Sequence, residues 1–137
     1  MEKTLVLIKP DAMQRGLANT ILSRLEKLGL RLAALKMLHL DKALAERHYA
    51  VHRDKPFFNE LVSYITSAPI VAAVFEGDNA VDRARQAMGA TDPAKAAAGT
   101  IRGDLGIDIE NNSVHGSDSV VTAEYEISLF FSGDEVF

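Results

Sequence analysis

The sequence predicts an α+β fold in which a small antiparallel sheet is covered by helices. Apolar runs typical of strands occur at residues 5–8, 30–40 and 70–75, and a short fourth strand is expected at residues 113–116. Amphipathic segments with helical spacing lie between and after these runs. Without its additional helices, the order of elements is βαββαβ. This order is the ferredoxin-like arrangement, a four-stranded antiparallel sheet with helices packed around it.

The first helix is predicted for residues 17–28. Its apolar side chains recur at helical spacing until Gly29 ends the pattern. Lys9 and Pro10 end the strand that comes before it, and Asp11 follows them. Asp11 is therefore expected to cap this helix.

Further helices are predicted for residues 42–52, 57–66 and 79–88. A last helix is expected after Ser119, because a serine hydroxyl caps helix N-termini well. Residues 91–112 lack a periodic pattern and contain three glycines, so a long loop is expected there. Loops of this length in compact domains are usually functional.

The composition limits the class of protein. The chain has 137 residues, and we expect residues 1–137 to form a single domain. With 47% hydrophobic and 25% charged residues, it has the composition of a globular protein. A net charge of -4 argues against general nucleic-acid binding, and the absence of cysteine excludes thiolate chemistry. No apolar stretch reaches membrane-spanning length and no signal peptide is evident, so we expect a cytoplasmic location without a membrane partner.

The most informative stretch is residues 112–119, which read Asn-Ser-Val-His-Gly-Ser-Asp-Ser. His115 follows a β-branched residue and precedes Gly116, which we expect to leave room for a bulky reactant. Ser117, Asp118 and Ser119 supply partners for an imidazole or for a helix start. A histidine that is exposed on one side and fixed on the other has what a nucleophile requires.

Candidate phosphate ligands are present without the usual phosphate motifs. Lys9, Arg85 and Arg102 are candidate cations, although each alone is more simply explained as a solvated surface charge. The P-loop, the dinucleotide-binding glycine motif and the protein-kinase motifs are all missing. A phosphate-handling protein that lacks these motifs but has a glycine-flanked histidine indicates a phosphohistidine intermediate.

His48 and His52 have the i, i+4 spacing of two metal ligands on one helix face. No third ligand and no H-E-x-x-H motif accompanies them. We therefore expect two exposed helix histidines and no metal held by protein side chains.

Residues 112–118 match the N-x-x-H-G-S-D signature of nucleoside diphosphate kinases, and the resemblance covers nearly the whole chain. Residues 4–12 resemble the family's opening strand with its Lys-Pro-Asp-Ala. Residues 48–49 and 55–58 resemble the region that clamps the nucleotide. Residues 88–93 and 99–104 resemble the loop that closes over the phosphates. Two features depart from the family: Ala98 replaces a proline that many members have, and the C-terminus is short.

The resemblance implies a role for each candidate residue. His115 is the phosphorylated nucleophile, and Ser117 and Glu126 orient it. Lys9 serves in both catalysis and nucleotide binding. The residues implied to surround the phosphates and ribose are Lys9, Tyr49, Arg85, Thr91, Arg102 and Asn112, while Phe57 and Leu61 hold the base.

The implied reaction moves the γ-phosphate of a nucleoside triphosphate to a nucleoside diphosphate by a ping-pong mechanism. Mg²⁺ is expected to enter through the nucleotide phosphates, and the family likeness implies a homo-oligomer built from dimers. Two alternatives stay open at this point. One is a phosphohistidine carrier that relays phosphate between proteins, and the other is a non-catalytic binding module in which His115 is structural. Lys9, Arg102 and Asn112 beside His115 argue against the second.

Overall fold

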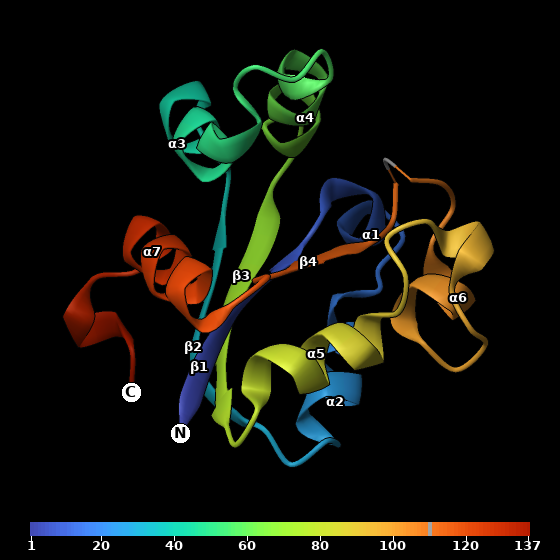
Figure 1. Cartoon of the computed structure of the whole chain (residues 1–137), viewed down its shortest axis with the longest axis vertical. Helices are drawn as coiled ribbons and strands as arrows, with labels where there is room; N and C mark the ends of the chain where they lie inside the picture. Colours follow the sequence, from blue (N-terminus) through green and yellow to red (C-terminus); the bar gives the residue numbers. More distant parts are fainter. Residues whose placement is uncertain (110) are drawn as a thin grey trace.

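The computed structural model describes residues 1–109 and 111–137. Four strands form one antiparallel sheet in the order β2-β3-β1-β4 (Figure 1). Their bounds are β1 Glu2–Ile8, β2 Arg31–Leu38, β3 Ile70–Gly77 and β4 Val114–Gly116. The strand order and pairing are those of the predicted ferredoxin-like arrangement.

Helices cover both faces of the sheet, as Figure 1 shows. Alternating side chains of β1 explain this arrangement: Leu5 and Leu7 pack with α3, α4 and α7, whereas Val6 and Ile8 pack with α2, α5 and α6. The central strands β1 and β3 are therefore apolar on both faces and almost completely buried. The helices are α1 Pro10–Gln14, α2 Ala18–Glu26, α3 Lys42–His48, α4 Phe58–Ile65, α5 Ala80–Met88, α6 Ile101–Leu105 and α7 Val120–Phe130, with 3₁₀ turns η1 Ala50–His52, η2 Pro93–Lys95 and η3 Gly133–Glu135.

Several element boundaries differ from the sequence predictions. The predicted loop at residues 91–112 contains η2 and the short helix α6, whose N-cap Thr100 accepts a hydrogen bond from the Gly103 N–H. The helix predicted for residues 42–52 divides into α3 and η1. Asp11 does not cap the helix at residues 18–26; it lies inside the additional helix α1, buried against another part of the chain.

In the described part of the chain, no helix has both the length and the apolar composition needed to cross a membrane.

Candidate active site

His115 lies in the middle of β4, the short edge strand, and pairs with Leu7 of β1. Its side chain is about one-fifth exposed, at 22%. The neighbours Val114 and Gly116 point to the opposite face, where Val114 joins the core. A Cβ at Gly116 would lie only 2.8 Å from the sulfur of Met88 on α5. A side chain at this position would collide with α5, and the glycine also lines the cavity beside His115.

Glu126 on α7 fixes the orientation of the His115 ring. Its Oε2 lies 3.1 Å from Nε2 of His115, while its Oε1 accepts a 2.6 Å hydrogen bond from Ser117 Oγ. Ser117 is itself anchored by the backbone N–H of Leu5, which donates to its Oγ at 3.1 Å. Burial alone would raise the pKa of Glu126, but the hydrogen bonds and charge of His115 and the Ser117 hydroxyl hold it below its ordinary value.

The ionised carboxylate of Glu126 determines the tautomer of His115. Because a carboxylate only accepts hydrogen bonds, Nε2 of His115 carries the proton and donates it. The other nitrogen, Nδ1, then holds a lone pair, and it makes no hydrogen bond to the described part of the chain. In this tautomer the unprotonated nitrogen of the imidazole is the nucleophilic atom.

His48 lies behind His115, and sequence reasoning missed this position. Their rings meet edge to face, with centroids 4.7 Å apart and an interplanar angle of 81°. The expectation of an exposed helix histidine is wrong, since the side chain is only 1% exposed. Burial, followed by the charge of His115, lowers the pKa of His48 to about 3, despite the opposing carboxylate of Glu126. His48 is therefore neutral beside the nucleophile.

Lys9 reaches the site from the end of β1. Its ammonium donates a 2.9 Å hydrogen bond to Asn112 Oδ1, and the Asn112 amide in turn donates to the backbone oxygen of Thr91 at 3.0 Å. Burial, then the charge of Arg102, lowers the pKa of Lys9 to about 8, while Asp11 opposes the shift. A buried ammonium with few partners is stabilised by a bound anion, so Lys9 is suited to anion binding.

Two guanidinium groups flank the other side of His115. Arg102 donates to the backbone oxygens of Gly89 and Val114, both at 2.9 Å, and so connects α5 to β4. Its Nε is buried without a partner in the described part of the chain. Burial and the charge of Arg85 lower the pKa of Arg102 to about 10. Arg85 is more exposed and pairs with Asp118 at 2.7 Å.

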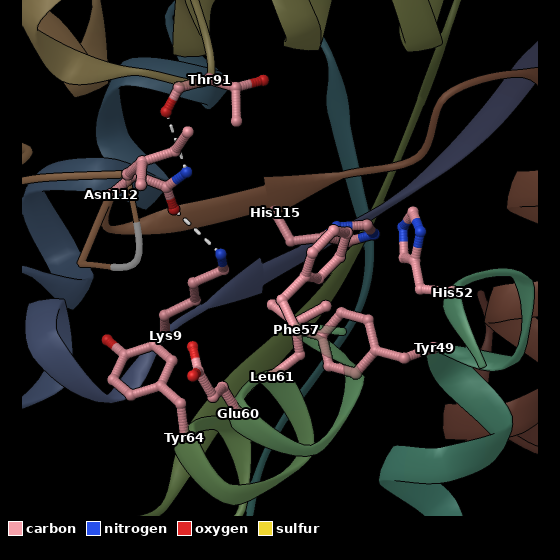
Figure 2. Close-up of a pocket in the computed structure, with 11 residues that line it drawn as sticks. Lys9, Tyr49, His52, Phe57, Glu60, Leu61, Tyr64, Thr91, Asn112 and His115 are labelled. Atoms are coloured by element: carbon pink, nitrogen blue, oxygen red, sulfur yellow. Dashed lines mark hydrogen bonds between the residues drawn. The ribbon is translucent and has the colours of Figure 1, made fainter. Parts of the chain in front are cut away.

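Two adjoining cavities meet at His115. The smaller, about 280 Å³, is lined by the cations and by Glu126, and the larger, about 460 Å³, extends past Phe57 and Leu61. Figure 2 shows the larger cavity, with Lys9, Asn112 and Tyr64 at one end and Phe57, Tyr49 and His52 at the other. The combined space thus has a cationic end beside the nucleophile and an apolar end.

The structure brings the residues singled out in the sequence into one site. All of them line the two cavities except Ser117, which lies behind Glu126. The residues concerned are Lys9, Tyr49, Phe57, Leu61, Arg85, Thr91, Arg102, Asn112, His115 and Glu126. The sequence analysis assigned no individual role to His48, which lines the smaller cavity, or to Glu60, Tyr64 and Ile109, which line the larger one.

One group of side chains in the described residues brings metal-ligating atoms together, namely His48, His115 and Glu126. Two imidazoles and one carboxylate do not form the oxygen set that Mg²⁺ prefers. The donor set of this cluster therefore does not fit a magnesium ion.

Comparison with known proteins places this geometry in context. A family model described as "Nucleoside diphosphate kinase" matches residues 2–136. A curated protein of that name from Dehalococcoides mccartyi is 65% identical over 136 residues, which cover 99% of this chain and 96% of that protein. Another from Archaeoglobus fulgidus is 57% identical and covers 99% of this chain and 90% of that protein.

Solved structures agree with these matches. The nucleoside diphosphate kinase of Aquifex aeolicus superposes with a TM-score of 0.97 at 44% identity, covering 99% of both chains. The enzyme of Halobacterium salinarum, solved in complex with CDP, superposes with a TM-score of 0.96 at 51% identity and covers 99% of this chain and 91% of that one. The likeness confirms the predicted fold class and spans every site residue described above.

Proposed function

The chain belongs to the nucleoside diphosphate kinase family, and we propose that it moves the γ-phosphate of a nucleoside triphosphate to a nucleoside diphosphate through a phosphohistidine at His115. Membership makes the chain a phosphotransferase. The observation that carries the proposed mechanism is the pair formed by His115 and Glu126, which leaves Nδ1 unprotonated at the meeting point of the two cavities.

In the first half-reaction, the lone pair of His115 Nδ1 forms a bond to the γ-phosphorus. The bond between that phosphorus and its bridging oxygen breaks, and the nucleoside diphosphate leaves with the electron pair. Glu126 stabilises the positive charge that develops on the imidazole, because its carboxylate lies 3.1 Å from Nε2. The second half-reaction reverses these steps with another diphosphate in the same site, which gives ping-pong kinetics.

The three cations would stabilise the transferring group. Lys9, Arg85 and Arg102 border the cavity that contains His115, where they would offset charge on the equatorial oxygens. They lie on separate elements, at the end of β1 and on α5 and α6, and would therefore approach the phosphorus from several sides. Thr91, Asn112 and Tyr49 line both cavities and would contact the phosphates and ribose.

The apolar end of the larger cavity would hold the base. Phe57 is 42% exposed and Leu61 lies beside it in the lining, so a base would pack on apolar surfaces. Stacking of this kind tolerates any base, because every base has a π face. That the Halobacterium salinarum relative was solved with CDP supports a nucleotide in this space.

We propose that Mg²⁺ would enter with the nucleotide and be held by the nucleotide and not by side chains of this chain. The side chains of the site offer no oxygen cluster of the kind Mg²⁺ prefers among the residues described. When bound, the ion would neutralise charge between the β- and γ-phosphates.

We also propose a homodimer as the basic assembly. Strand β2 is at the edge of the sheet and exposes Leu35 at 50% and Met37 at 66%. The other face of the strand is occupied by the C-terminal segment, where Lys36 pairs with Glu135. An apolar strand edge of this kind is a template for pairing with a second chain.

A cytoplasmic location is proposed from the substrates. Nucleoside triphosphates are made and consumed in the cytoplasm, where an enzyme that equilibrates them would act. Immunodetection in fractionated cells would test this location.

A phosphohistidine carrier is the weaker alternative. Such a protein needs an exposed histidine but no nucleotide cavity, whereas here about 460 Å³ of space with an apolar end adjoins the nucleophile. The family match also supports the kinase and not the carrier.

The test is the mass of the protein after incubation with Mg-ATP. We expect one added phosphoryl group per chain, in a bond that is labile to acid and stable to alkali, as a phosphoramidate is. His115→Ala should remove the addition, and a nucleoside diphosphate should discharge it from the wild type. An addition that persists in His115→Ala would overturn the mechanism.

A further inference from the structure

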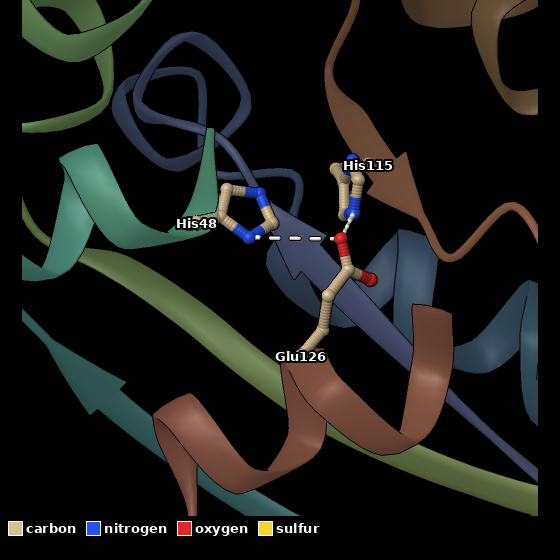
Figure 3. A group of neighbouring side chains, drawn as sticks. All are labelled: His48, His115 and Glu126. Carbon is tan, nitrogen blue, oxygen red and sulfur yellow. Dashed lines mark hydrogen bonds and ion pairs between the residues drawn. The ribbon is translucent and has the colours of Figure 1, made fainter. Parts of the chain in front are cut away.

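Three metal-ligating side chains from separate elements converge beside the nucleophile, as Figure 3 shows. They are His48 on α3, His115 on β4 and Glu126 on α7. Glu126 Oε2 lies 3.1 Å from Nε2 of His115 and 3.6 Å from Nδ1 of His48. One ligand atom from each residue lies within 4.8 Å of the others. The nucleotide chemistry described above uses two of these residues and leaves His48 without a role.

His48 has coordinating capacity that the fold does not use. Its side chain is 1% exposed, and neither ring nitrogen has a hydrogen-bond partner among the described residues. Burying an imidazole without partners is unfavourable, because the hydrogen bonds to water are lost. A cation at Nδ1 would replace the lost interaction, and the carboxylate of Glu126 lies on that side of the ring.

We propose that His48, His115 and Glu126 form a binding site for Zn²⁺ and that the bound ion inhibits phosphoryl transfer. Two histidines and one glutamate are an established donor set for zinc sites with an open position. With zinc–ligand bonds of about 2.0–2.2 Å, the ligand atoms of a tetrahedral site lie roughly 3.3 Å apart. The distances from Glu126 Oε2 to the two imidazole nitrogens, 3.1 Å and 3.6 Å, are close to this value. The remaining separation, between the two imidazole nitrogens, is at most 4.8 Å.

The open position faces the cavity of about 280 Å³, which all three residues line, so a water molecule would complete the tetrahedron. Lys9 and Arg102 border the same cavity and repel any cation there. This repulsion weakens the site relative to a structural zinc centre. The ion would therefore exchange with solution, as a reversible inhibitor does.

Zinc would inhibit by reversing the tautomer of His115, and this part of the inference rests on the proposed function. In the free enzyme Nε2 carries the proton and donates it to Glu126. Zinc takes the lone pair of Nε2, and the proton displaced from Nε2 is regained at Nδ1 from water, with no net change in proton count. A protonated Nδ1 has no lone pair to attack phosphorus, so the phosphoenzyme cannot form.

Calorimetric titration of the metal-free protein with Zn²⁺ tests binding without an activity assay. We expect one ion per chain, and His48→Phe, which keeps a ring against Tyr49 and Phe130, should weaken binding at least about tenfold. His39→Gln is the matched control, because His39 is an exposed histidine that bonds to Thr66 outside the site. In the wild type, Co²⁺ should give the intense visible absorption of a tetrahedral complex.

The link to catalysis is tested on protein loaded with Zn²⁺ and desalted. Phosphate incorporation from Mg-ATP should fall in the wild type and return after EDTA treatment, and in His48→Phe it should not depend on zinc. Equal zinc binding by the wild type and His48→Phe, or loss of binding in His39→Gln, would overturn the proposal. If the zinc-free wild type takes up no phosphate, the proposed function fails instead, and the calorimetric result still decides the zinc site.

Discussion

The carboxylate of Asp11 accepts a 3.1 Å hydrogen bond from the backbone N–H of Ser113, 102 positions later in the chain. Ser113 is fully buried and has a φ of 75°, a left-handed conformation that is uncommon for a residue with a side chain. The other carboxylate oxygen accepts a hydrogen bond from the Tyr64 hydroxyl. Asp11 thus stabilises the strained residue from which β4 carries His115 into the site.

Replacing Asp11 with alanine should lower the free energy of unfolding by about 1–3 kcal/mol, because the buried N–H of Ser113 is left without a partner. Denaturant unfolding followed by circular dichroism measures this change. Asp54→Ala, at an exposed position, should shift stability by less than about 0.5 kcal/mol and serves as control. A variant of Asp11 as stable as the wild type would mean that Ser113 does not need this support.

The buried ammonium of Lys9 predicts an alkaline limit to activity. The pKa of Lys9 is lowered to about 8, so above this pH the free enzyme loses the charge that would bind phosphate. We expect kcat/KM to fall above about pH 8, since this parameter reports ionisations of the free enzyme. Lys9→Arg keeps its charge throughout this range, so its profile should lack the decline even if its rate is lower. A wild-type profile that stays flat to pH 9.5 would contradict the prediction.

The same shift has a consequence for stability with the opposite direction in pH. Between about pH 8 and 10.5 the unfolded chain holds the Lys9 proton that the folded protein has lost. The unfolded state then binds more protons, so this group favours folding increasingly as the pH rises through that window. Below about pH 8 the cost of burying the charged ammonium is fully present. Loss of activity at high pH therefore should not be accompanied by loss of fold through Lys9.

The fold was largely predictable because its central strands are apolar on both faces. Residues 5–8 and 70–75 form continuous apolar runs, and the structure buries nearly all of them. Helix α6 was not predictable from periodicity, because its five residues make less than two turns. Position 103 requires glycine, because a Cβ there would lie 2.1 Å from the backbone oxygen of Ala97. This glycine is one of the three that led the sequence analysis to predict a loop.

The candidate site was predictable where a motif places residues close together, and not where only tertiary contacts do. His115 and Asn112 belong to one signature, so the sequence predicts that both lie in the same site. As a possible metal ligand His48 was paired with His52, four positions away, whereas its partners are on β4 and α7. Asp11 was assigned a local capping role, although its partners are Ser113 and Tyr64. A buried polar residue satisfied by distant parts of the chain leaves no periodic signal in the sequence.

Arg102→Lys should reduce both activity and stability, because lysine keeps the charge but loses the planar fork. The guanidinium donates to the Gly89 and Val114 carbonyls at once, and an ammonium at this position would keep at most one of these bonds. We expect kcat/KM to fall at least about tenfold if the fork also contacts phosphate, with a loss of about 1.5–3 kcal/mol in stability.

Arg83→Lys provides a matched control for Arg102. The Arg83 side chain also donates to two backbone carbonyls, those of Leu28 and Asp78, but it lies outside the cavities. The Arg83→Lys variant should be less stable than the wild type but should keep the kcat/KM of the wild type. Wild-type kcat/KM in Arg102→Lys would show that Arg102 does not bind phosphate.

The proposed dimer predicts that charge on the edge of β2 abolishes assembly. Leu35→Glu combined with Met37→Glu places two carboxylates on the exposed apolar face of the edge strand. Light scattering at micromolar concentration should report a dimer or a multiple of dimers for the wild type and a monomer for the variant. Val51→Glu adds charge at another highly exposed apolar residue and should leave assembly unchanged. A monomeric wild type would refute the dimer.

Ala98 occupies the second position of a turn that suits proline. The Thr100 N–H donates to the Ala97 oxygen at 3.2 Å, and Gly99 at the third position has a φ of 91°, which are the features of a type II turn. Proline is favoured at the second position of such turns because its ring fixes φ near the required value. Ala98 is exposed, and its backbone N–H donates no hydrogen bond within the described part of the chain.

Ala98→Pro should therefore stabilise the protein by about 0.4–1 kcal/mol, because proline reduces the conformational entropy of the unfolded chain. Thermal unfolding should show a midpoint that is higher by a few degrees. Ala96→Pro is the matched control two residues earlier: its φ of -79° also suits proline, but its N–H donates to the Pro93 oxygen at 3.2 Å. That variant should lose stability, because the hydrogen bond disappears. A lowered midpoint for Ala98→Pro would show that the turn before α6 does not have the type II geometry in solution.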